Sequence, residues 1–338
     1  MRIRYGRFGT LIFAAFACLF HRQAALGRQG AGDKPLLLVT SFGPGAIALP
    51  GRKEWKLDIF NVYDDGRRPV AQYSKGESGM TASFSLFENL SGKPSAQGCR
   101  EDAIRPIIEH LSKSISGRVD ADARNTAGEI LATTSYRIDL GEAAGHHYQR
   151  NLFGFAGSAK TCAEIHISSV RDTPAEEDAM KVVLADFRPD LAYNPTTGDY
   201  FLLASLLFKS SPALAAPYYK SSLDTMPKDF SYLTPRRVVT DQLVMSLGMS
   251  GDLSGSRSLA EKAVAADPDY PMNYYNLACI DAEQGNAAQA RSHLQQAFDR
   301  RANVLKGESM PDPTHDDSIL KLKKDSAFWT FVQGLPKN

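Results

Sequence analysis

The stretch that decides the architecture of this chain runs from Asp269 to Arg301 and reads DYPMNYYNLACIDAEQGNAAQARSHLQQAFDRR. Its first half repeats side chains three or four residues apart, which places them on one face of a helix: Tyr274, Leu277, Ala278 and Asp281. Gly285-Asn286 then interrupts the pattern where a chain can turn at low steric cost. The second half carries another helical stripe, made of Ala287, Ala290, Leu294, Ala297 and Phe298. The pattern therefore predicts a hairpin of two short helices, which cannot bury its apolar face alone.

This hairpin resembles one tetratricopeptide (TPR) repeat. The resemblance rests on the aromatic Tyr274, on Asn276-Leu277-Ala278, on the turn at Gly285, and on the spacing of Ala290, Leu294 and Ala297. One departure is Asp281, because the family usually has a large aromatic or apolar residue at this position. We therefore expect weaker packing inside this repeat than in a typical family member.

A second hairpin with the same spacing comes before it. Leu243, Gly251 and Ala263 lie 34 residues before Leu277, Gly285 and Ala297, and this is the TPR period. A less complete hairpin is expected from Tyr200 to Met226. After Arg301 the pattern stops, and aromatic residues at 328, 329 and 331 are expected to cap the open end. The prediction is an all-α TPR-like array over residues 194–302, followed by a loop and capping helices over 303–338.

The first half of the chain has a different pattern. Residues 28–193 are predicted to form an α+β domain, in which helices pack on an antiparallel sheet. Runs with alternating apolar side chains predict strands over residues 55–59, 81–88, 129–140, 147–155 and 161–170. Helices are expected from about residue 100 to 111 and over 176–187. In the first of these, Pro106 favours a regular start one turn later.

The order of these elements over residues 50–190 is similar to that of PsbP/Mog1-like domains. The residues that carry the similarity are Trp55-Lys56-Leu57 near the start and Ala185-Asp186-Phe187-Arg188-Pro189 after the last helix. The resemblance implies a binding or assembly module without chemistry of its own. It assigns no functional residue.

The N-terminal residues 1–27 have the layout of a secretory signal peptide. Three arginines precede an apolar run from Leu11 to Phe20, and Ala25-Leu26-Gly27 offers small residues for cleavage. Because the apolar run is short, we expect no membrane span after cleavage. An uncleaved anchor and a lipid anchor at Cys18 are the alternatives. The expected location is the periplasm or the exterior of the cell.

Export changes how the cysteines are interpreted. In an oxidising compartment two nearby thiols form a disulfide, and Cys99 with Cys162 is the candidate pair. The alternative is that both are buried thiols that pack like small apolar side chains. Cys279 falls within the first helix of the 269–301 hairpin, and we expect it to be a free core thiol.

The sequence offers little catalytic chemistry. The net charge of +1 argues against an obligate nucleic-acid partner, which needs a clustered basic surface. The histidines at 146, 147 and 166 could join Cys162 at a metal, but His146 and His147 point to opposite faces of a strand. Solvent-facing strand residues and a disulfide explain the same residues. No metal, no cofactor and no catalytic residue is predicted.

Binding is the better-supported class of function. The TPR resemblance implies a concave surface formed by the first helices of the hairpins, with Gln242, Met245, Tyr275, Asn276 and Glu283 on it. In peptide-binding members of the family, the position of Asn276 often holds the ligand backbone. The alternative is that the first domain or the terminal segment fills this groove.

Two functions follow as hypotheses. The first is a non-enzymatic, exported interaction or assembly module of the cell envelope, which binds a protein or peptide and whose helical array packs on its own first domain. The second is an enzyme or small-ligand binder with its site in the first domain, at residues such as Tyr148, Glu164 and His166. An open groove beside Tyr275 and Asn276 would favour the first, and a deep polar pocket in the first domain the second.

Overall fold

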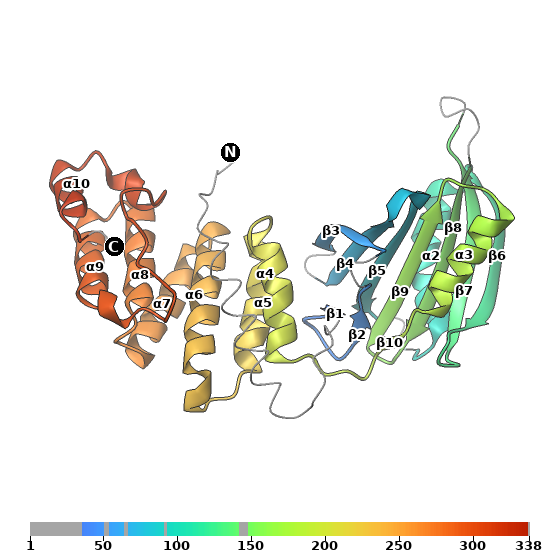
Figure 1. Ribbon diagram of the computed structural model, residues 1–338, viewed down its shortest axis with the longest axis horizontal. Helices are drawn as coiled ribbons and strands as arrows, with labels where there is room; N and C mark the ends of the chain where they lie inside the picture. The colour runs from blue at the N-terminus through green and yellow to red at the C-terminus, as the bar shows by residue number, and fades with distance from the viewer. Residues whose placement is uncertain (1–35, 51–53, 64–66, 91–92, 142–147, 337–338) are drawn as a thin grey trace. The chain divides into compact units, whose positions relative to one another are not determined.

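The structure is a computed structural model that describes residues 36–50, 54–63, 67–90, 93–141 and 148–336 (Figure 1). The expected signal peptide, Cys18, His146 and His147 lie outside these ranges. Contacts between residues divide the chain into a sheet unit, Asp33–Leu207, and a helical unit that begins at Phe208. The sequence-based boundary lies earlier, at residue 193. The mixed α+β class, with antiparallel sheets and a helical C-terminal half, is confirmed.

The sheet unit is built on a seven-stranded antiparallel sheet with the order β3-β4-β5-β9-β8-β7-β6. The strands are β3 (Lys56–Tyr63), β4 (Arg68–Lys75), β5 (Met80–Glu88), β6 (Ile115–Arg124), β7 (Ile130–Asp139), β8 (Tyr148–Gly157) and β9 (Thr161–Ser169). A smaller antiparallel sheet combines β1 (Leu37–Val39), β2 (Ala46–Ala48) and β10 (Pro189–Asp190). Its residues Leu38 and Ile47 join the core over β4 and β5.

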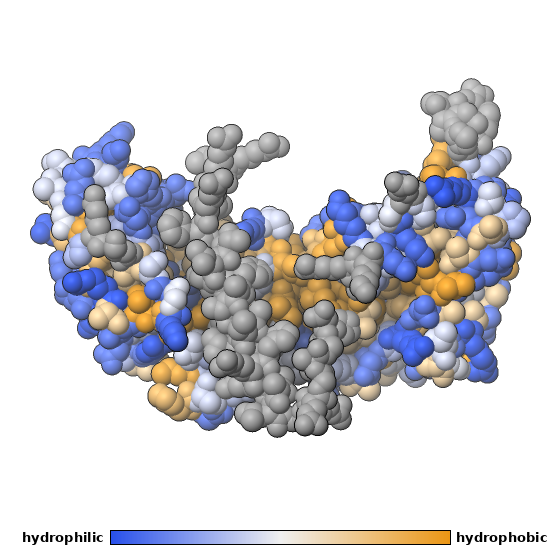
Figure 2. All heavy atoms as spheres, viewed as in Figure 1, coloured by the Kyte–Doolittle hydropathy of each residue, from blue (hydrophilic) through white to orange (hydrophobic). Residues whose placement is uncertain are grey.

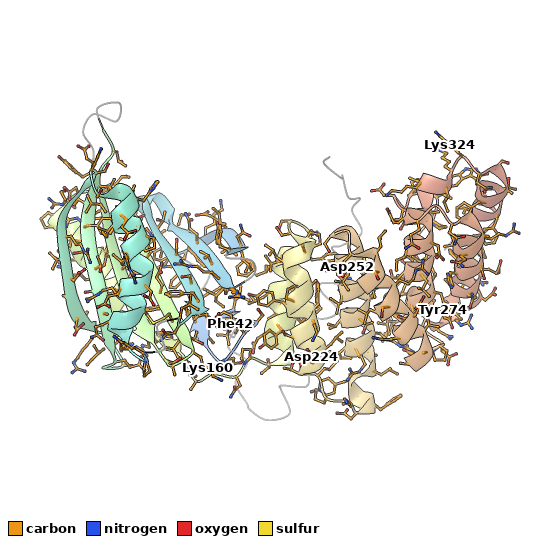
Figure 3. The ribbon with its side chains drawn as sticks, turned by 180° about the vertical axis from the view of Figure 1, so that it is seen from behind. Phe42, Lys160, Asp224, Asp252, Tyr274 and Lys324 are labelled. Carbon is orange, nitrogen blue, oxygen red and sulfur yellow. A yellow bond between two sulfur atoms is a disulfide. The ribbon has the colours of Figure 1, made fainter. Side chains whose placement is uncertain are left out.

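The two faces of the large sheet are covered differently. Helix α3 (Pro174–Ala185) packs Met180 and Leu184 against the face that carries Ile165 and Ile167. Helix α2 (Ala96–Leu111) lies on the opposite face, over β7 and β8. Figure 3 shows this second face, on which α2 leaves β3, β4 and β5 without a covering helix. Within the residues that the structure describes, one half of this face of the sheet unit therefore has no helix packed on it.

Several strands and one helix start differ from the sequence-based prediction, and the short β2 and β10 are among these strands. Strands β4 and β6 were not predicted, because their sequences RPVAQYSK and ISGRVDADAR are polar and lack a clear apolar alternation. Helix α2 begins earlier than expected, at Ala96, because the Ser95 hydroxyl accepts a hydrogen bond from the Gly98 amide and caps it. Pro106 lies inside this helix, so the prediction that it delays the regular start by one turn is wrong.

The helical unit consists of helical hairpins. Its helices are α5 (Pro212–Asp224), α6 (Leu233–Met249), α7 (Leu253–Ala266), α8 (Pro271–Glu283) and α9 (Ala287–Asp299), and they follow α4 (Thr197–Phe208) of the sheet unit. The hairpins α6–α7 and α8–α9 share their turn chemistry. Gly251 and Gly285 both have positive φ, at 92° and 76°, a conformation that favours glycine. The side chains of Asp252 and Asn286 then cap α7 and α9.

The last part of the chain belongs to the same core as α8 and α9. Met310, Ile319 in η6 (Ile319–Leu322), and Phe328 and Val332 in α10 (Ser326–Gln333) are buried with Tyr274, Leu294 and Phe298. Hydrophilic residues predominate at the left-hand end of Figure 2, where α8 to α10 lie. None of the helices in the described part of the chain combines the length and the apolar character needed to span a bilayer.

Candidate functional site

The five residues predicted to line the concave surface of the array lie on α6 and α8. Tyr275 and Asn276 are buried, and Glu283 is half-buried. Met245 on α6 retains 37% of its exposure, and its neighbour Gln242 is half-buried. Residues 241, 242 and 245 precede 275, 276 and 279 by 34 positions, so α6 and α8 present the same surface in successive hairpins. The two helices contact each other directly.

The part of this surface on α8 is occupied by residues 308–322 of the same chain, here called the C-terminal segment. Tyr275 donates its hydroxyl to Asp316 over 3.3 Å, and the Cys279 thiol lies 3.8 Å from the same carboxylate. Glu283 accepts hydrogen bonds from the Ser318 hydroxyl, at 2.7 Å, and from Lys321. Two of the five predicted positions, Tyr275 and Glu283, and the nearby Cys279 thus contact the chain's own C-terminal segment, as in the alternative stated from the sequence.

A second polar contact holds the same segment near the start of α8. The Tyr270 hydroxyl donates to Glu308 over 2.8 Å, and Tyr270 is fully buried. Burial, together with the nearby carboxylates of Asp241 and Glu308, raises the pKa of this phenol far above its ordinary value. Tyr270 therefore acts as a hydrogen-bond donor at every physiological pH.

Asn276 is used inside the array rather than at its open surface. Its amide donates to Asp241 on α6 over 2.7 Å, and both side chains are buried. Burial raises the pKa of Asp241 to about 7, an effect to which Glu308 adds and which the Asn276 hydrogen bond opposes. The contact joins one hairpin to the next through a carboxyl group that titrates near neutrality.

Asp281 is fully buried and has two partners. Arg257 on α7 approaches one carboxylate oxygen at 2.5 Å, and His293 Nδ1 on α9 approaches the other at 2.6 Å. Arg257 also donates to Gln284. The departure from the TPR pattern therefore replaces an apolar contact with a polar one that connects α7, α8 and α9.

The uncovered half-face of the sheet is polar, and the register of the strands accounts for its composition. Ser83 on β5 pairs with His166 on β9, and Ser85 pairs with Glu164. On the other side of β5, Val70 pairs with Ser85 and Gln72 with Ser83. Because neighbouring strands are about 4.8 Å apart, these side chains form a continuous patch. Glu164 and His166 are two residues apart on β9 and therefore share this face.

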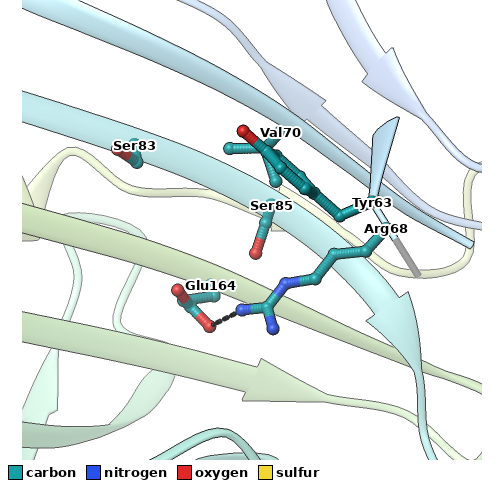
Figure 4. A pocket seen from close by; sticks show the side chains of 6 residues that line it. All are labelled: Tyr63, Arg68, Val70, Ser83, Ser85 and Glu164. Atoms are coloured by element: carbon teal, nitrogen blue, oxygen red, sulfur yellow. Dashed lines mark hydrogen bonds and ion pairs between the residues drawn. The ribbon is translucent and has the colours of Figure 1, made fainter. Parts of the chain in front are cut away.

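A hollow of about 340 Å³ opens in this patch, lined by Tyr63, Arg68, Val70, Ser83, Ser85 and Glu164 (Figure 4). Arg68 Nη2 lies 2.8 Å from Glu164 Oε2, and the guanidinium lies 4.9 Å above the Phe87 ring. Glu164 is buried, so desolvation raises its pKa while Arg68 lowers it. The two charges cancel within the hollow.

Ser85 is the least satisfied polar group of the hollow. It is 3% exposed, and its Oγ has no hydrogen-bond partner among the described residues. Figure 4 shows this hydroxyl turned towards the Arg68–Glu164 pair. A buried hydroxyl without a partner costs about 1–3 kcal/mol. Such a group at the wall of a hollow is a feature of sites that receive a ligand atom.

The surroundings of His166 suit a packed structural residue and not a general base. Its ring stacks on Phe153 with 4.0 Å between centroids, and its Nε2 lies 2.9 Å from Asn151 Oδ1. The Asn151 amide nitrogen donates to the Gln149 carbonyl, so Oδ1 is the acceptor and His166 Nε2 carries the proton. Burial lowers the pKa of His166 to about 4, which keeps the ring neutral at physiological pH.

Tyr148 does not join Glu164 and His166. It lies on β8 two positions from Arg150, which pairs with Glu177 on α3, so strand alternation places Tyr148 on the α3 face of the sheet. Sequence reasoning also missed Arg68 and Ser85. Arg68 starts a strand that was not predicted, 96 residues away from Glu164. Ser85 lies on a predicted strand, but nothing in the sequence indicates that its hydroxyl is unpartnered.

The predicted proximity of Cys99 and Cys162 is confirmed. Their sulfur atoms are 1.96 Å apart and their Cα atoms 5.6 Å, which joins α2 to β9. Cys162 therefore pairs with Cys99 and not with His166. Within the described ranges, no three His, Cys, Asp or Glu side chains come together as a metal-binding group. The free cysteine there is Cys279.

Comparison of the sequence with known protein families and with curated proteins finds no match.

Proposed function

We propose that this protein is an exported, non-enzymatic interaction protein whose helical unit is a TPR-like array that binds an extended protein segment. The observation that carries the proposal is the docking of the C-terminal segment on α8. Asp316, Ser318 and Lys321 reach side chains of one helix face as a bound peptide would. The surface is thus suited to an extended segment that combines an acidic group with hydroxyl and amino groups.

The partner binds, in this proposal, on the adjoining surface of α6. There Met245 occupies the position equivalent to Cys279 of α8, the residue whose thiol lies beside Asp316. Met245 is partly exposed. A flexible thioether adapts to varied apolar partners. Gln242 beside it offers an amide for a peptide backbone. The partner segment would therefore lie on α6, next to the C-terminal segment on α8.

Export is part of the proposal. The Cys99–Cys162 pair lies at bonding distance and is expected to be oxidised outside the cytoplasm. The basic and apolar run in residues 1–27 supports the same location. An interaction role in the cell envelope agrees with both features.

Site-specific photocrosslinking tests the proposal. A benzophenone amino acid at position 245, in the full chain expressed in its native cell, is expected to give a discrete crosslinked species with a second protein. The matched control carries the same group at Lys262, an exposed position on α7, the second helix of its hairpin. Crosslinks at both positions alike, or at neither, would contradict a binding surface on α6.

A further inference from the structure

The uncovered half-face of the sheet unit carries a second, independent inference. No helix of the described ranges packs on this face over β3, β4 and β5, whereas α2 covers β7 and β8 on the same side. The opposite face is closed by α3 and by the β1–β2 pair. Among the described residues, the patch around Ser83 and Ser85 therefore has no packing role that would explain its polar composition.

The Arg68–Glu164 pair indicates that the patch was shaped for something other than stability. An ion pair this buried gains little over an apolar pair of similar size, because both charges lose their hydration. Glu164 is 7% exposed, and the Arg68 side chain retains 29% of its exposure. Both side chains line the hollow, and the partly exposed Arg68 guanidinium is within reach of a ligand there.

The charge balance restricts the class of ligand. An anion would meet the Glu164 carboxylate, and a cation would meet the Arg68 guanidinium. His166 adds no charge, because its pKa of about 4 keeps it neutral at physiological pH. A purely apolar ligand would leave the Ser85 hydroxyl buried without a partner and would further desolvate the Arg68–Glu164 pair, which is costly. A neutral ligand that both donates and accepts hydrogen bonds satisfies all of these groups.

The surroundings of the hollow favour several hydroxyl groups on one ligand. A second hollow adjoins the first through Ser83 and is lined by side chains that include Gln72, Thr81, Gln149 and Ser168. Thr81 and Ser168 already exchange a hydrogen bond of 2.8 Å between their hydroxyls. Tyr63 provides an aromatic ring that is 48% exposed at the rim. A flat aromatic ring can stack on the C–H face of a sugar ring. The hydroxyl and amide side chains beside it can bond the hydroxyl groups at the edge of the same sugar.

We infer that this half-face binds a neutral carbohydrate, with Tyr63 stacking on a sugar ring and Ser85, Arg68 and Glu164 bonding its hydroxyl groups. The groups of the site are side chains on the face of the sheet, so backbone pairing with a peptide strand plays no part. This inference stands apart from the proposed peptide surface, which lies in the helical unit.

Calorimetric titration of the full chain with neutral tetrasaccharides tests it. The probes are tetramers of glucose in β-1,4 and α-1,4 linkage and of N-acetylglucosamine, with a tetramer of galacturonic acid as the charged comparison. We expect at least one neutral tetramer to bind and the acidic tetramer to bind at least tenfold more weakly. Absence of binding by all the neutral probes, or tighter binding of the acidic one, would overturn the inference.

Two pairs of variants place the binding on this face. Tyr63→Ala and Ser85→Ala are each expected to weaken binding at least tenfold, whereas Tyr148→Ala and Ser135→Ala, on the opposite face by strand alternation, leave it unchanged. Because the Ser85 hydroxyl has no hydrogen-bond partner within the described part of the chain, Ser85→Ala should not lower the melting temperature. Equal effects in both pairs would place the ligand elsewhere and refute the site.

Discussion

Two buried carboxyl groups of the helical unit, Asp281 and Asp241, differ in how their negative charge is compensated. Asp281 is held by Arg257 and His293, so it exchanges hydration for two close polar contacts. Asp241 has only the amides of Asn276 and Gln242 as hydrogen-bond donors, and Glu308 adds negative charge nearby. Asp281 therefore links α7, α8 and α9 through these two contacts. Asp241 is instead destabilised in its charged form by burial, which raises its pKa.

Replacement of Asp281 by alanine is expected to lower the free energy of unfolding by about 3 kcal/mol, the lower end for breaking a buried ion pair. The value lies at that end because Arg257 keeps 23% of its side-chain exposure and can regain some hydration. Urea unfolding followed by circular dichroism measures it. Asp299→Ala, which removes an exposed carboxylate from α9, should change stability by less than about 0.5 kcal/mol. Similar values for both variants would show that the Asp281 contacts contribute nothing.

Asp241 predicts a pH dependence. Its pKa is raised from 3.8 to about 7 in the folded chain, so the folded state binds the proton more tightly than the unfolded state does. This contribution to stability is complete below about pH 4 and is lost as the pH rises through 7. Asp241→Asn has no carboxyl to titrate at this position. Between pH 5 and pH 8, the free energy of unfolding of the variant should therefore rise by about 2 kcal/mol relative to that of the wild type.

Urea midpoints of both proteins at the two pH values measure this difference. Glu164 and Asp316 also have raised pKa values, but they are present in both proteins and cancel in the comparison. A constant difference between variant and wild type from pH 5 to pH 8 would mean that Asp241 keeps an ordinary pKa.

At the scale of elements, the helices were easier to predict than the strands. The hairpins α6–α7 and α8–α9 each combine an apolar stripe with a glycine turn, and both signals are local in sequence. Strand β6 lacks such a signal, because it is an edge strand with almost every residue exposed. Only the partner strand decides that such a segment is extended, and that partner is not visible from local sequence.

The sites follow the same rule. Alternation along β9 was enough to group Cys162, Glu164 and His166, because period two is a local property. The approach of Arg68 to Glu164 depends on β4 lying next to β5 and β5 next to β9, which is a property of the whole sheet. The hydrogen bond from Tyr275 to Asp316 likewise depends on the packing of residues 308–322 against α8, which is a tertiary contact.

The link between Cys99 and Cys162 joins helix α2 to strand β9 across 63 residues of sequence. A disulfide that closes a loop of this length contributes about 4 kcal/mol in the chain-entropy model. The double variant Cys99→Ala/Cys162→Ala should lose stability of that order. In the unfolded, non-reduced full chain a thiol reagent should find two of the four cysteines reactive. Four reactive thiols would show that the bond does not form.

At the scale of the whole molecule, the docking of the C-terminal segment depends on Asp316. Its carboxylate accepts from Tyr275 and from the backbone amides of Ser318 and Ile319. Asp316→Ala should therefore raise the rate of tryptic cleavage at Lys321 by roughly tenfold, since cleavage requires local opening. Asp317→Ala, the exposed neighbour, is the matched control. Equal cleavage of the two variants, measured by mass spectrometry, would contradict this role.

The docked C-terminal segment also sets a threshold for any competitor at α8. Because it is covalently attached, its effective concentration near its own binding surface is in the millimolar range or above. A separate peptide with the same contacts must overcome that local concentration, and its apparent affinity falls by the fraction of time that the surface is vacant. If the helical unit binds a protein segment as proposed, only ligands that are much better matched than residues 308–322, or that bind beside them on α6, can therefore engage it at ordinary cellular concentrations.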